Sequence, residues 1–219
     1  MPEPELGAVR AAYDTVAESY AAQITGLSAE TPLEIALIED FAARIRSAGG
    51  GPVLDAGSGP GRVAAYLHSQ GLDVSGVDLS PAMVDVARRS HPGIRFAVGP
   101  LQHLDVVDGS LAGILAWYSI IHTPLAELPV VFDEFRRAMA PGGYLLVGIH
   151  VGTGTLRVTQ SYGHDVSVEL QLLRPEEVTV LLESCGFSIV ATLSRAPEGR
   201  ERRPQAFVLA RRTGERRPA

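Results

Sequence analysis

The chain lacks lysine and asparagine altogether and has one cysteine among its 219 residues. Because all 19 basic residues are arginine, no side chain can form the Schiff base that a pyridoxal enzyme needs. The same absence excludes a phosphate-binding loop that ends in Gly-Lys-Ser or Gly-Lys-Thr. Cys185 has no partner for an internal disulfide, which favours a reducing compartment.

Long apolar runs and an excess of positive charge are also absent. No uncharged apolar run reaches the length of about 18 residues that crosses a bilayer, and no basic segment precedes an apolar run near residue 1. We therefore expect a cytoplasmic protein without a membrane span or secretory signal. The net charge of −6 disfavours nucleic-acid binding, and the arginines of residues 200–217 are interpreted as a solvated edge and tail.

The most informative stretch is Val53–Arg62. An apolar pair leads into Asp55, and glycines then occupy the alternate positions Gly57, Gly59 and Gly61 before a helical pattern begins. Glycine accepts positive φ angles and lets another molecule approach the backbone. Free N–H groups at a helix start favour polar or anionic groups. The stretch predicts a strand, a tight turn and a helix N-terminus that hold a polar cofactor.

Strands and helices alternate along the rest of the chain. The predicted strands are 53–56, 72–77, 94–98, 111–118, 144–149, 187–195 and 205–211, and the predicted helices are 8–25, 32–48, 61–70, 80–89, 175–185 and one that starts at Thr123-Pro124. The alternation predicts right-handed crossovers and an α/β fold with a mostly parallel sheet. The last two strands predict an antiparallel hairpin, and residues 151–173 are predicted to be irregular or β-like.

Asp78 closes the second predicted strand, 17 residues after Gly61. At the carboxyl end of a strand, a carboxylate can accept hydrogen bonds from both hydroxyls of a ribose. The other role open to Asp78 is to cap the helix that begins at Ser80, although Ser80 itself supplies a cap. The spacing Gly57-x-Gly59-x-Gly61 is one residue too short for a dinucleotide, and Asp55 would repel a pyrophosphate. A nicotinamide dehydrogenase is therefore disfavoured, and Asp55 suits a cofactor with a positive ammonium group.

Four motifs occur in order: Asp55–Gly61, Gly76–Pro81, Leu115–His122 and Ala140–Tyr144. Together they resemble the class I S-adenosylmethionine-dependent methyltransferases, over about residues 10–210, and more narrowly the small standalone bacterial enzymes that act on small molecules. The resemblance implies a Rossmann-like three-layer sandwich with a seven-stranded sheet. It implies one domain over 1–219: a helical lid (1–30), a cofactor-binding core (31–150), a substrate-roof insertion (151–173), a final helix and hairpin (174–212) and a tail (213–219).

The resemblance also implies where S-adenosylmethionine is bound. The glycine loop would lie along the methionine part, Asp55 near its ammonium, Asp78 on the ribose hydroxyls and Trp117 beside the methionine. The full set of implied cofactor-binding residues is Tyr13, Tyr20, Asp55, Gly57, Ser58, Gly59, Gly61, Asp78, Leu79, Met83, Pro100, Leu101, Gln102 and Trp117. The family often has an acid where Pro100 stands and Asp where Ala112 stands, so the adenine contact is expected from Leu101 N–H or Gln102.

Two histidines are candidates for a general base. His122 lies just past the fourth predicted strand, near the methyl group in this architecture, although it could instead orient the lid. His150 ends the fifth strand and is the second candidate. Tyr118, His122, Tyr162 and His164 are the predicted substrate contacts. The histidines lack metal-ligand spacing, so we predict no metal, and Cys185 is interpreted as buried packing.

The sequence therefore predicts methyl transfer to an oxygen or nitrogen of a small molecule, with a bacterial secondary metabolite as the expected acceptor. The alternative is a protein that binds S-adenosylmethionine without transferring its methyl group, as a cyclase or a partner-binding module. A general base is needed only if the nucleophile must lose a proton. The acceptor and the choice between monomer and homodimer stay open at this point.

Overall fold

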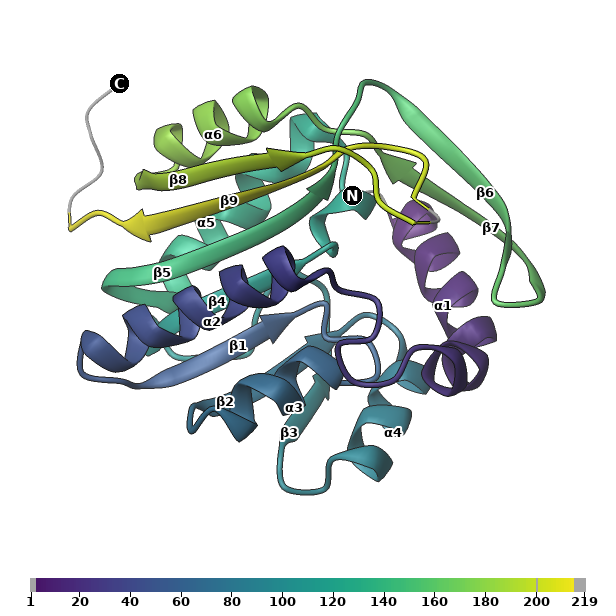
Figure 1. Cartoon of the computed structure of the whole chain (residues 1–219), viewed down its shortest axis with the longest axis horizontal. Coiled ribbons are helices and arrows are strands. Elements are labelled where there is room, and N and C mark those ends of the chain that lie inside the picture. The colour runs from purple at the N-terminus through teal and green to yellow at the C-terminus, as the bar shows by residue number, and fades with distance from the viewer. Residues whose placement is uncertain (1–2, 200, 215–219) are drawn as a thin grey trace.

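The computed structural model describes residues 3–199 and 201–214 (Figure 1). The helices are α1 (Glu3–Gln23), α2 (Pro32–Ser47), α3 (Arg62–Ser69), α4 (Pro81–Ser90), α5 (Leu128–Ala138) and α6 (Pro175–Ser184), with 3-10 turns η1 (Ile120–His122) and η2 (Leu125–Glu127). The strands are β1 (Pro52–Ala56), β2 (Asp73–Asp78), β3 (Arg95–Val98), β4 (Leu111–Trp117), β5 (Met139–His150), β6 (Thr155–Ser161), β7 (His164–Gln171), β8 (Phe187–Arg195) and β9 (Gln205–Arg212).

Within these residues, seven strands form one sheet in the order β3-β2-β1-β4-β5-β9-β8. The first five run parallel, whereas β9 pairs antiparallel with both β5 and β8. The predicted α/β fold, with its mostly parallel sheet and its C-terminal hairpin, is confirmed. Strands β2 and β3 are added on one side of β1, and β4 and the later strands on its other side. The carboxyl ends of β1 and β4 therefore flank the point where ligands bind in such sheets.

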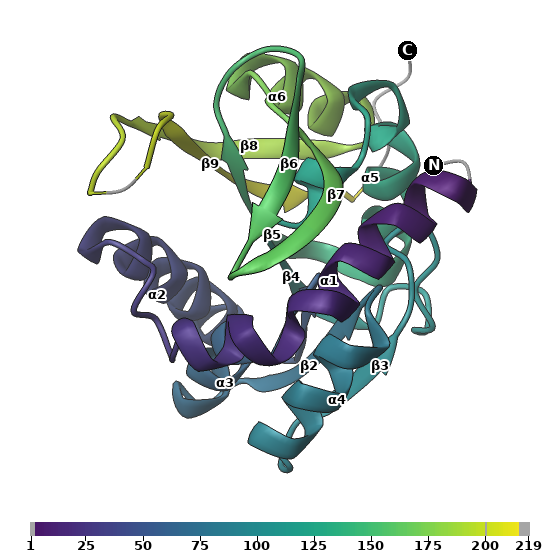
Figure 2. The ribbon, with the colours of Figure 1, turned by 90° about the vertical axis from the view of Figure 1, so that its right-hand side faces the viewer.

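Each face of the sheet buries its own apolar cluster. Leu54 and Ile114 face α5 and α6, whereas their neighbours Val53 and Leu115 face α2, α3 and α4. This alternation is what a sheet covered by helices on both sides requires, because successive side chains of a strand point to opposite faces. The three layers are seen in Figures 1 and 2.

The start of α2 follows from its sequence. Thr31 accepts a hydrogen bond from the backbone N–H of Glu34 at 3.3 Å, and Glu34 Oε2 accepts one from the Thr31 N–H at 2.7 Å. This capping box, with Pro32 in the first turn, satisfies N–H groups that a helix start leaves unpaired. It also fixes Glu34, which is 2 % exposed, so that its other carboxylate oxygen points toward the carboxyl end of the sheet.

The helix α1 crosses the carboxyl end of the sheet and packs on α4 and β7 (Figure 2). Val16 and Ala17 bury against Met83 and Val86 of α4. Asp14 Oδ1 accepts hydrogen bonds from the Ser80 hydroxyl at 2.6 Å and from the Ala82 N–H at 3.1 Å. The first helix is thus fastened to the N-terminus of α4, where a carboxylate is favoured.

One segment meets the sequence-based expectation in its β-like form, and a second differs from it. Residues 151–173, expected to be irregular or β-like, form a separate antiparallel pair of strands, β6 and β7, joined by a turn in which Tyr162 has φ 50° and Gly163 φ 85°. The α-helix expected from Thr123-Pro124 begins only at Leu128, after η2, because Pro129 is tolerated only in a first turn.

The division into lid, core, roof and tail stays a prediction. Among residues 3–199 and 201–214, none of the helices has the length and apolar character to cross a membrane.

Candidate functional site

A cavity of about 280 Å³ lies beneath α1, at the carboxyl ends of β1, β2 and β4. Its walls include most of the residues singled out from the sequence: Tyr13, Tyr20, Asp55, Gly57, Ser58, Gly59, Asp78, Leu79, Met83, Pro100, Leu101, Gln102, Trp117, Tyr118, His122, His150 and Tyr162. These residues come from seven separate segments of the chain. The structure brings them together, and the role of each stays a prediction.

Two of the predicted site residues lie outside the cavity wall. Gly61 caps α3 with φ 81°, and a Cβ there would meet the ring of Phe96 at 2.6 Å, so this glycine permits packing of helix on sheet. His164 lies at the start of β7, where its Nε2 is hydrogen-bonded to the Ser19 hydroxyl of α1 at 2.8 Å. Its place is between α1 and the β6–β7 hairpin.

The glycine turn has the left-handed backbone that its sequence predicts. Gly57 has φ 80° and Gly59 has φ 53°. A Cβ on Gly57 would lie 2.2 Å from the Cβ of Ser119, so no side chain fits there. Around Gly59 the position of a Cβ is empty to 4 Å, although the residue lines the cavity. The turn therefore leaves open backbone beside the cavity at Gly59.

Asp78 connects this turn to α4. Its Oδ2 accepts a hydrogen bond from the Gly59 N–H at 2.8 Å, and its Oδ1 accepts one from the Ser80 N–H at 2.8 Å. Ser80 caps α4 independently, since its hydroxyl accepts the Met83 N–H at 3.1 Å. Burial raises the pKa of Asp78 despite these bonds. Each carboxylate oxygen keeps a further lone pair, so the side chain can still accept hydrogen bonds from a ligand.

Asp55 is 2 % exposed; its carboxylate has a hydrogen bond from the backbone of Ala64, but its Oδ2 has no hydrogen-bond partner among the described residues. Burial raises the pKa of this carboxyl to about 7, although the nearby Arg62 guanidinium acts in the opposite direction. A buried carboxylate oxygen without a hydrogen-bond partner is costly. A cation placed beside Asp55 would remove this cost, which agrees with the expected ammonium group.

Three further buried polar atoms around the cavity lack partners among the described residues. They are Ser58 Oγ, Ser119 Oγ and Gln102 Oε1. Buried polar groups in native proteins are normally hydrogen-bonded, so a cluster of exceptions indicates a missing polar ligand. Together with Asp55 Oδ2 and the open backbone at Gly59, these atoms fit a cofactor with hydroxyl, amine and carboxylate groups.

His122 is held at both ring nitrogens. Its Nδ1 lies 3.1 Å from the carbonyl oxygen of Glu169, which can only accept, so Nδ1 carries the proton. Its Nε2 therefore accepts the hydrogen bond from the Tyr13 hydroxyl at 2.8 Å. Burial lowers the pKa of His122 to about 4. The nitrogen that a general base would use is already bonded to α1, so the geometry favours the lid-orienting alternative for His122.

Arg62 and Glu30 were not singled out from the sequence. The Arg62 guanidinium pairs with Glu30 at 2.6 and 2.7 Å and donates to the Tyr20 hydroxyl at 3.3 Å. Glu30 Oε1 also accepts the indole N–H of Trp117 at 3.2 Å. This ion pair orients two cavity residues. Its partners lie 32 residues apart, so no local pattern could have revealed it.

Comparison with known proteins agrees with this architecture. The family described as "Methyltransferase domain" matches residues 53–143, from β1 into β5. A malonyl-[acyl-carrier protein] O-methyltransferase of Serratia marcescens is 25% identical over 179 residues, 68% of this chain and 69% of that protein. Methyltransferase GfsG of Streptomyces halstedii is 34% identical over 127 residues, 55% of this chain. The match spans 45% of that protein, less than half of its length.

Solved structures share the whole fold. A Burkholderia thailandensis 1,6-didemethyltoxoflavin-N1-methyltransferase with bound S-adenosylhomocysteine has a TM-score of 0.70 at 20% identity and covers 97% of this chain and 91% of its own. Magnesium protoporphyrin IX methyltransferase of Synechocystis, also with S-adenosylhomocysteine, has a TM-score of 0.71 at 17% identity, covering 95% and 100%.

The glycine turn, the sheet order and these likenesses define a Rossmann-like methyltransferase. The chain belongs to the class I S-adenosylmethionine-dependent methyltransferases, as its motifs predicted. The family depends on S-adenosylmethionine, and solved neighbours hold that molecule or its demethylated product.

Proposed function

We propose that this chain transfers the methyl group of S-adenosylmethionine to an oxygen or nitrogen of a small-molecule acceptor. The observation that carries the proposal is the set of unpartnered buried polar atoms around the open glycine turn, with Asp55 and Asp78 on either side. When bound, the cofactor supplies a methyl group on a positive sulfur.

The residues of the chain would bind and orient. Asp55 would face the ammonium group and Asp78 the ribose hydroxyls. Leu79 and Met83 would pack on the adenine, and the backbone at Leu101 would meet its polar edge. The indole of Trp117, fixed by Glu30 and stacked on Phe207 at 5.1 Å between ring centroids, would form a rigid wall beside the methionine. Alignment of this kind can lower a barrier by about 7–11 kcal/mol.

The helix α1 would exclude water from the cavity. Tyr13 and Tyr20 cover the cavity from this helix, and Tyr20 lies 4.7 Å from the Tyr162 ring of the β6–β7 turn. One solved neighbour supports a small acceptor, since it is named a 1,6-didemethyltoxoflavin-N1-methyltransferase and holds 1,6-didemethyltoxoflavin. A bacterial secondary metabolite is therefore the acceptor that we propose.

One neighbour favours the second candidate function. The [4+2]-cyclase SpnF has a TM-score of 0.69 at 18% identity and covers 94% of this chain. In that candidate function the cofactor would be bound but not consumed. Transfer of a labelled methyl group into any product separates the two functions, because a cyclase leaves the label on the cofactor.

Calorimetric titration of S-adenosylmethionine, S-adenosylhomocysteine and NAD tests the cofactor site. Asp78→Ala should weaken binding of the first two by about tenfold or more, because a carboxylate that accepts two hydroxyls contributes about 1.5–3 kcal/mol. Asp73→Ala is the matched control, since Asp73 is exposed at the opposite end of the same strand. Failure of the folded wild-type protein to bind either of the first two molecules would overturn the proposal.

A further inference from the structure

A second cavity, of about 490 Å³, adjoins the first. The two share five wall residues: Arg62, Tyr118, His150, Tyr162 and Leu170. The rest of the second wall comes from the loop before α2 and its first turn, from β6 and the residue after β7, and from the β8–β9 loop and the start of β9: Ala29, Glu30, Glu34, Leu156, Leu172, Glu201, Arg202, Arg203 and Gln205. The shared residues therefore stand between the cofactor cavity and a neighbouring chamber.

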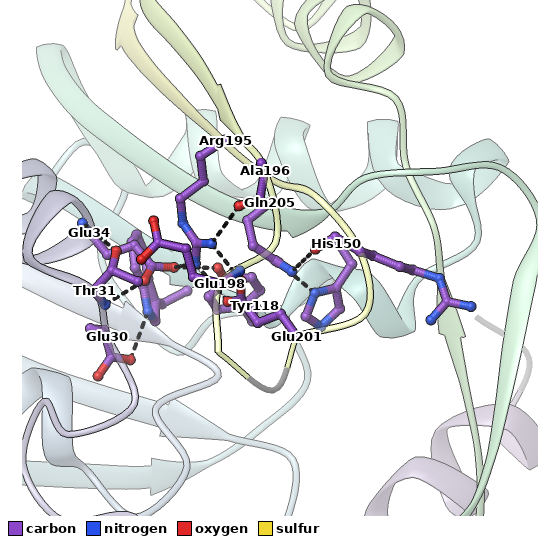
Figure 3. A network of polar contacts seen from close by, with 12 residues as sticks. Glu30, Thr31, Glu34, Tyr118, His150, Arg195, Ala196, Glu198, Glu201 and Gln205 are labelled. Atoms are coloured by element: carbon purple, nitrogen blue, oxygen red, sulfur yellow. Dashed lines mark hydrogen bonds and ion pairs between the residues drawn. The ribbon is translucent and has the colours of Figure 1, made fainter.

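One wall of this chamber is a rigid polar network (Figure 3). The Arg195 guanidinium is 6 % exposed and pairs with Glu34 at 3.0 Å and with Glu201 at 2.5 and 2.6 Å. Glu34 Oε1 also accepts the Tyr118 hydroxyl at 2.7 Å. The single guanidinium pairs with both carboxylates, so the network holds Tyr118 in place and carries a net charge of −1 when all three groups are ionised.

Tyr118 has φ 55°, a left-handed conformation that is strained for a bulky residue. Such strain persists only where the surroundings enforce it, and it is frequent at functional sites. Here the Glu34 hydrogen bond and the ring of His150, 4.9 Å away and inclined by 28°, hold the side chain at the boundary of the two cavities.

The hydrogen bonds around His150 define which of its ring nitrogens carries the proton. Gln205 is 3 % exposed, and its amide donates to the carbonyl of Arg203 at 2.9 Å. Its Oε1 therefore accepts from Nδ1 of His150 at 2.7 Å. Nδ1 carries the proton, so Nε2 carries the lone pair. Across the described part of the chain, no hydrogen bond is made to this Nε2, in contrast to His122.

The charges around His150 come from several elements. The Gln205 hydrogen bond, Glu201 of the β8–β9 loop and Glu34 of α2 favour its protonated form, whereas Arg203 of that loop disfavours it. Burial is the largest influence, and it lowers the pKa of His150. The imidazole is therefore neutral near pH 7 and able to accept a proton.

The chamber also limits the kind of acceptor. Leu156, Leu170 and Leu172 form an apolar wall suited to a ring system. Within the described residues, Arg202 and Arg203 have no ion-pair partner, and the carboxylates are already paired. A cationic amine would be repelled by these arginines, whereas a neutral or anionic oxygen compound would not.

We propose that the second cavity is the acceptor chamber, that its occupant is a phenol on an apolar ring system, and that Nε2 of His150 takes the phenolic proton. The inference rests on the proposed function and makes it specific. The phenolic oxygen forms a bond to the methyl carbon as the carbon–sulfur bond breaks, and the bonding electron pair stays on sulfur. The phenolic O–H bond breaks toward Nε2 of His150. Gln205 is a positioning residue, because it acts through the imidazole.

4-Nitrophenol tests proton transfer without turnover, because only its ionised form is yellow. The phenol is added to the protein with S-adenosylhomocysteine at a pH below the phenol's own pKa. We expect a larger ionised, yellow fraction of bound phenol in the wild-type protein than in His150→Gln, with the transfer partial because the pKa of His150 is lowered. His68→Gln, the matched control, should keep the wild-type fraction, because His68 is exposed in the last turn of α3 and lies outside both cavity walls. Absence of the yellow form in the wild type, or an equal yellow fraction in His150→Gln, would overturn the inference.

A second pair of variants tests the chamber. Leu156→Trp should weaken 4-nitrophenol binding by about tenfold or more by filling the cavity, while S-adenosylhomocysteine binding stays unchanged. Val180→Trp, on α6 and 63% exposed, is the control for the added indole. Equal phenol binding by both variants would overturn the chamber assignment. Failure of the wild type to bind S-adenosylmethionine would instead overturn the proposed function, so the two failures are distinguishable.

Discussion

The hydroxyl of Tyr13 lies 2.8 Å from Nε2 of His122, across 109 residues of sequence. The contact joins α1 to η1, directly over the cofactor cavity. Because the proton of His122 is on Nδ1, the tyrosine donates and the histidine accepts. With Nε2 as the acceptor, His122 holds α1 in place over the cavity.

Burial is the main cause of the lowered pKa of His122, about 4, and it remains in Tyr13→Phe; the variant should still raise this pKa, because the Tyr13 hydroxyl donates to the nitrogen that protonation would use. The loss of this hydrogen bond should also cost about 1 kcal/mol of stability. An NMR titration of the His122 ring gives the first value and urea unfolding the second. An unchanged His122 pKa would contradict the role of Tyr13.

Asp55 should make both stability and cofactor binding depend on pH. Its pKa rises from 3.8 to about 7 on folding, so between these values the folded chain binds more protons than the unfolded chain. Stability should therefore fall, relative to Asp55→Asn, as pH rises through this window. Binding of an ammonium-bearing cofactor near pH 7 should release a proton. Calorimetry in two buffers of different ionisation enthalpy measures the release, and equal release by Asp55→Asn would contradict it.

Alanine at Gly57 and at Gly59 should have different effects. Gly57→Ala puts a Cβ 2.2 Å from Ser119 and should destabilise the fold strongly. Gly59→Ala meets no atom within 4 Å and should cost only the ~1 kcal/mol of a left-handed alanine, yet weaken S-adenosylmethionine binding. Thermal unfolding and calorimetry separate the two effects. Tight cofactor binding by Gly59→Ala would show that the open backbone is not the binding surface.

The Glu34–Arg195–Glu201 network should carry a large share of the local stability. Arg195→Met leaves buried Glu34 without its guanidinium, and breaking a buried pair in this way costs about 3–5 kcal/mol. Arg44→Met removes an exposed pair with Asp40 and should cost less than about 1 kcal/mol. Urea unfolding of both variants makes the comparison. A similarly small loss of unfolding free energy in both variants would mean that Glu34 binds another partner or takes up a proton when Arg195 is removed.

The sequence predicted the fold because the relevant signals are local. The start of α2 is indicated within four residues by Thr31, Pro32 and Glu34. The glycines of the turn indicate positive φ angles by their residue type alone. The alternation of strand and helix then leaves few topologies, since crossovers between parallel strands are right-handed.

Tyr118, His150 and Tyr162 of the walls between the cavities were predicted site residues, but the contacts that hold them were not predicted, because these contacts join distant segments. Arg195 reaches Glu34 across most of the chain, and His150 finds Gln205 from 55 residues away. The β6–β7 hairpin was predicted only as irregular or β-like, although Val166, Val168 and Leu170 alternate with exposed polar residues as in a half-buried strand. The choice between His122 and His150 depended on these partners.

The placement of α1 has a consequence for how the molecule assembles. Its bonds to His122 and His164 close loops of 109 and 145 residues, whereas most pairs in the sheet form between elements nearer in sequence. Long loops are entropically costly to close and tend to close late in folding. We expect α1 to dock last and to open at lower free energy than the sheet. The last step of folding would then also be the step by which ligands enter and leave.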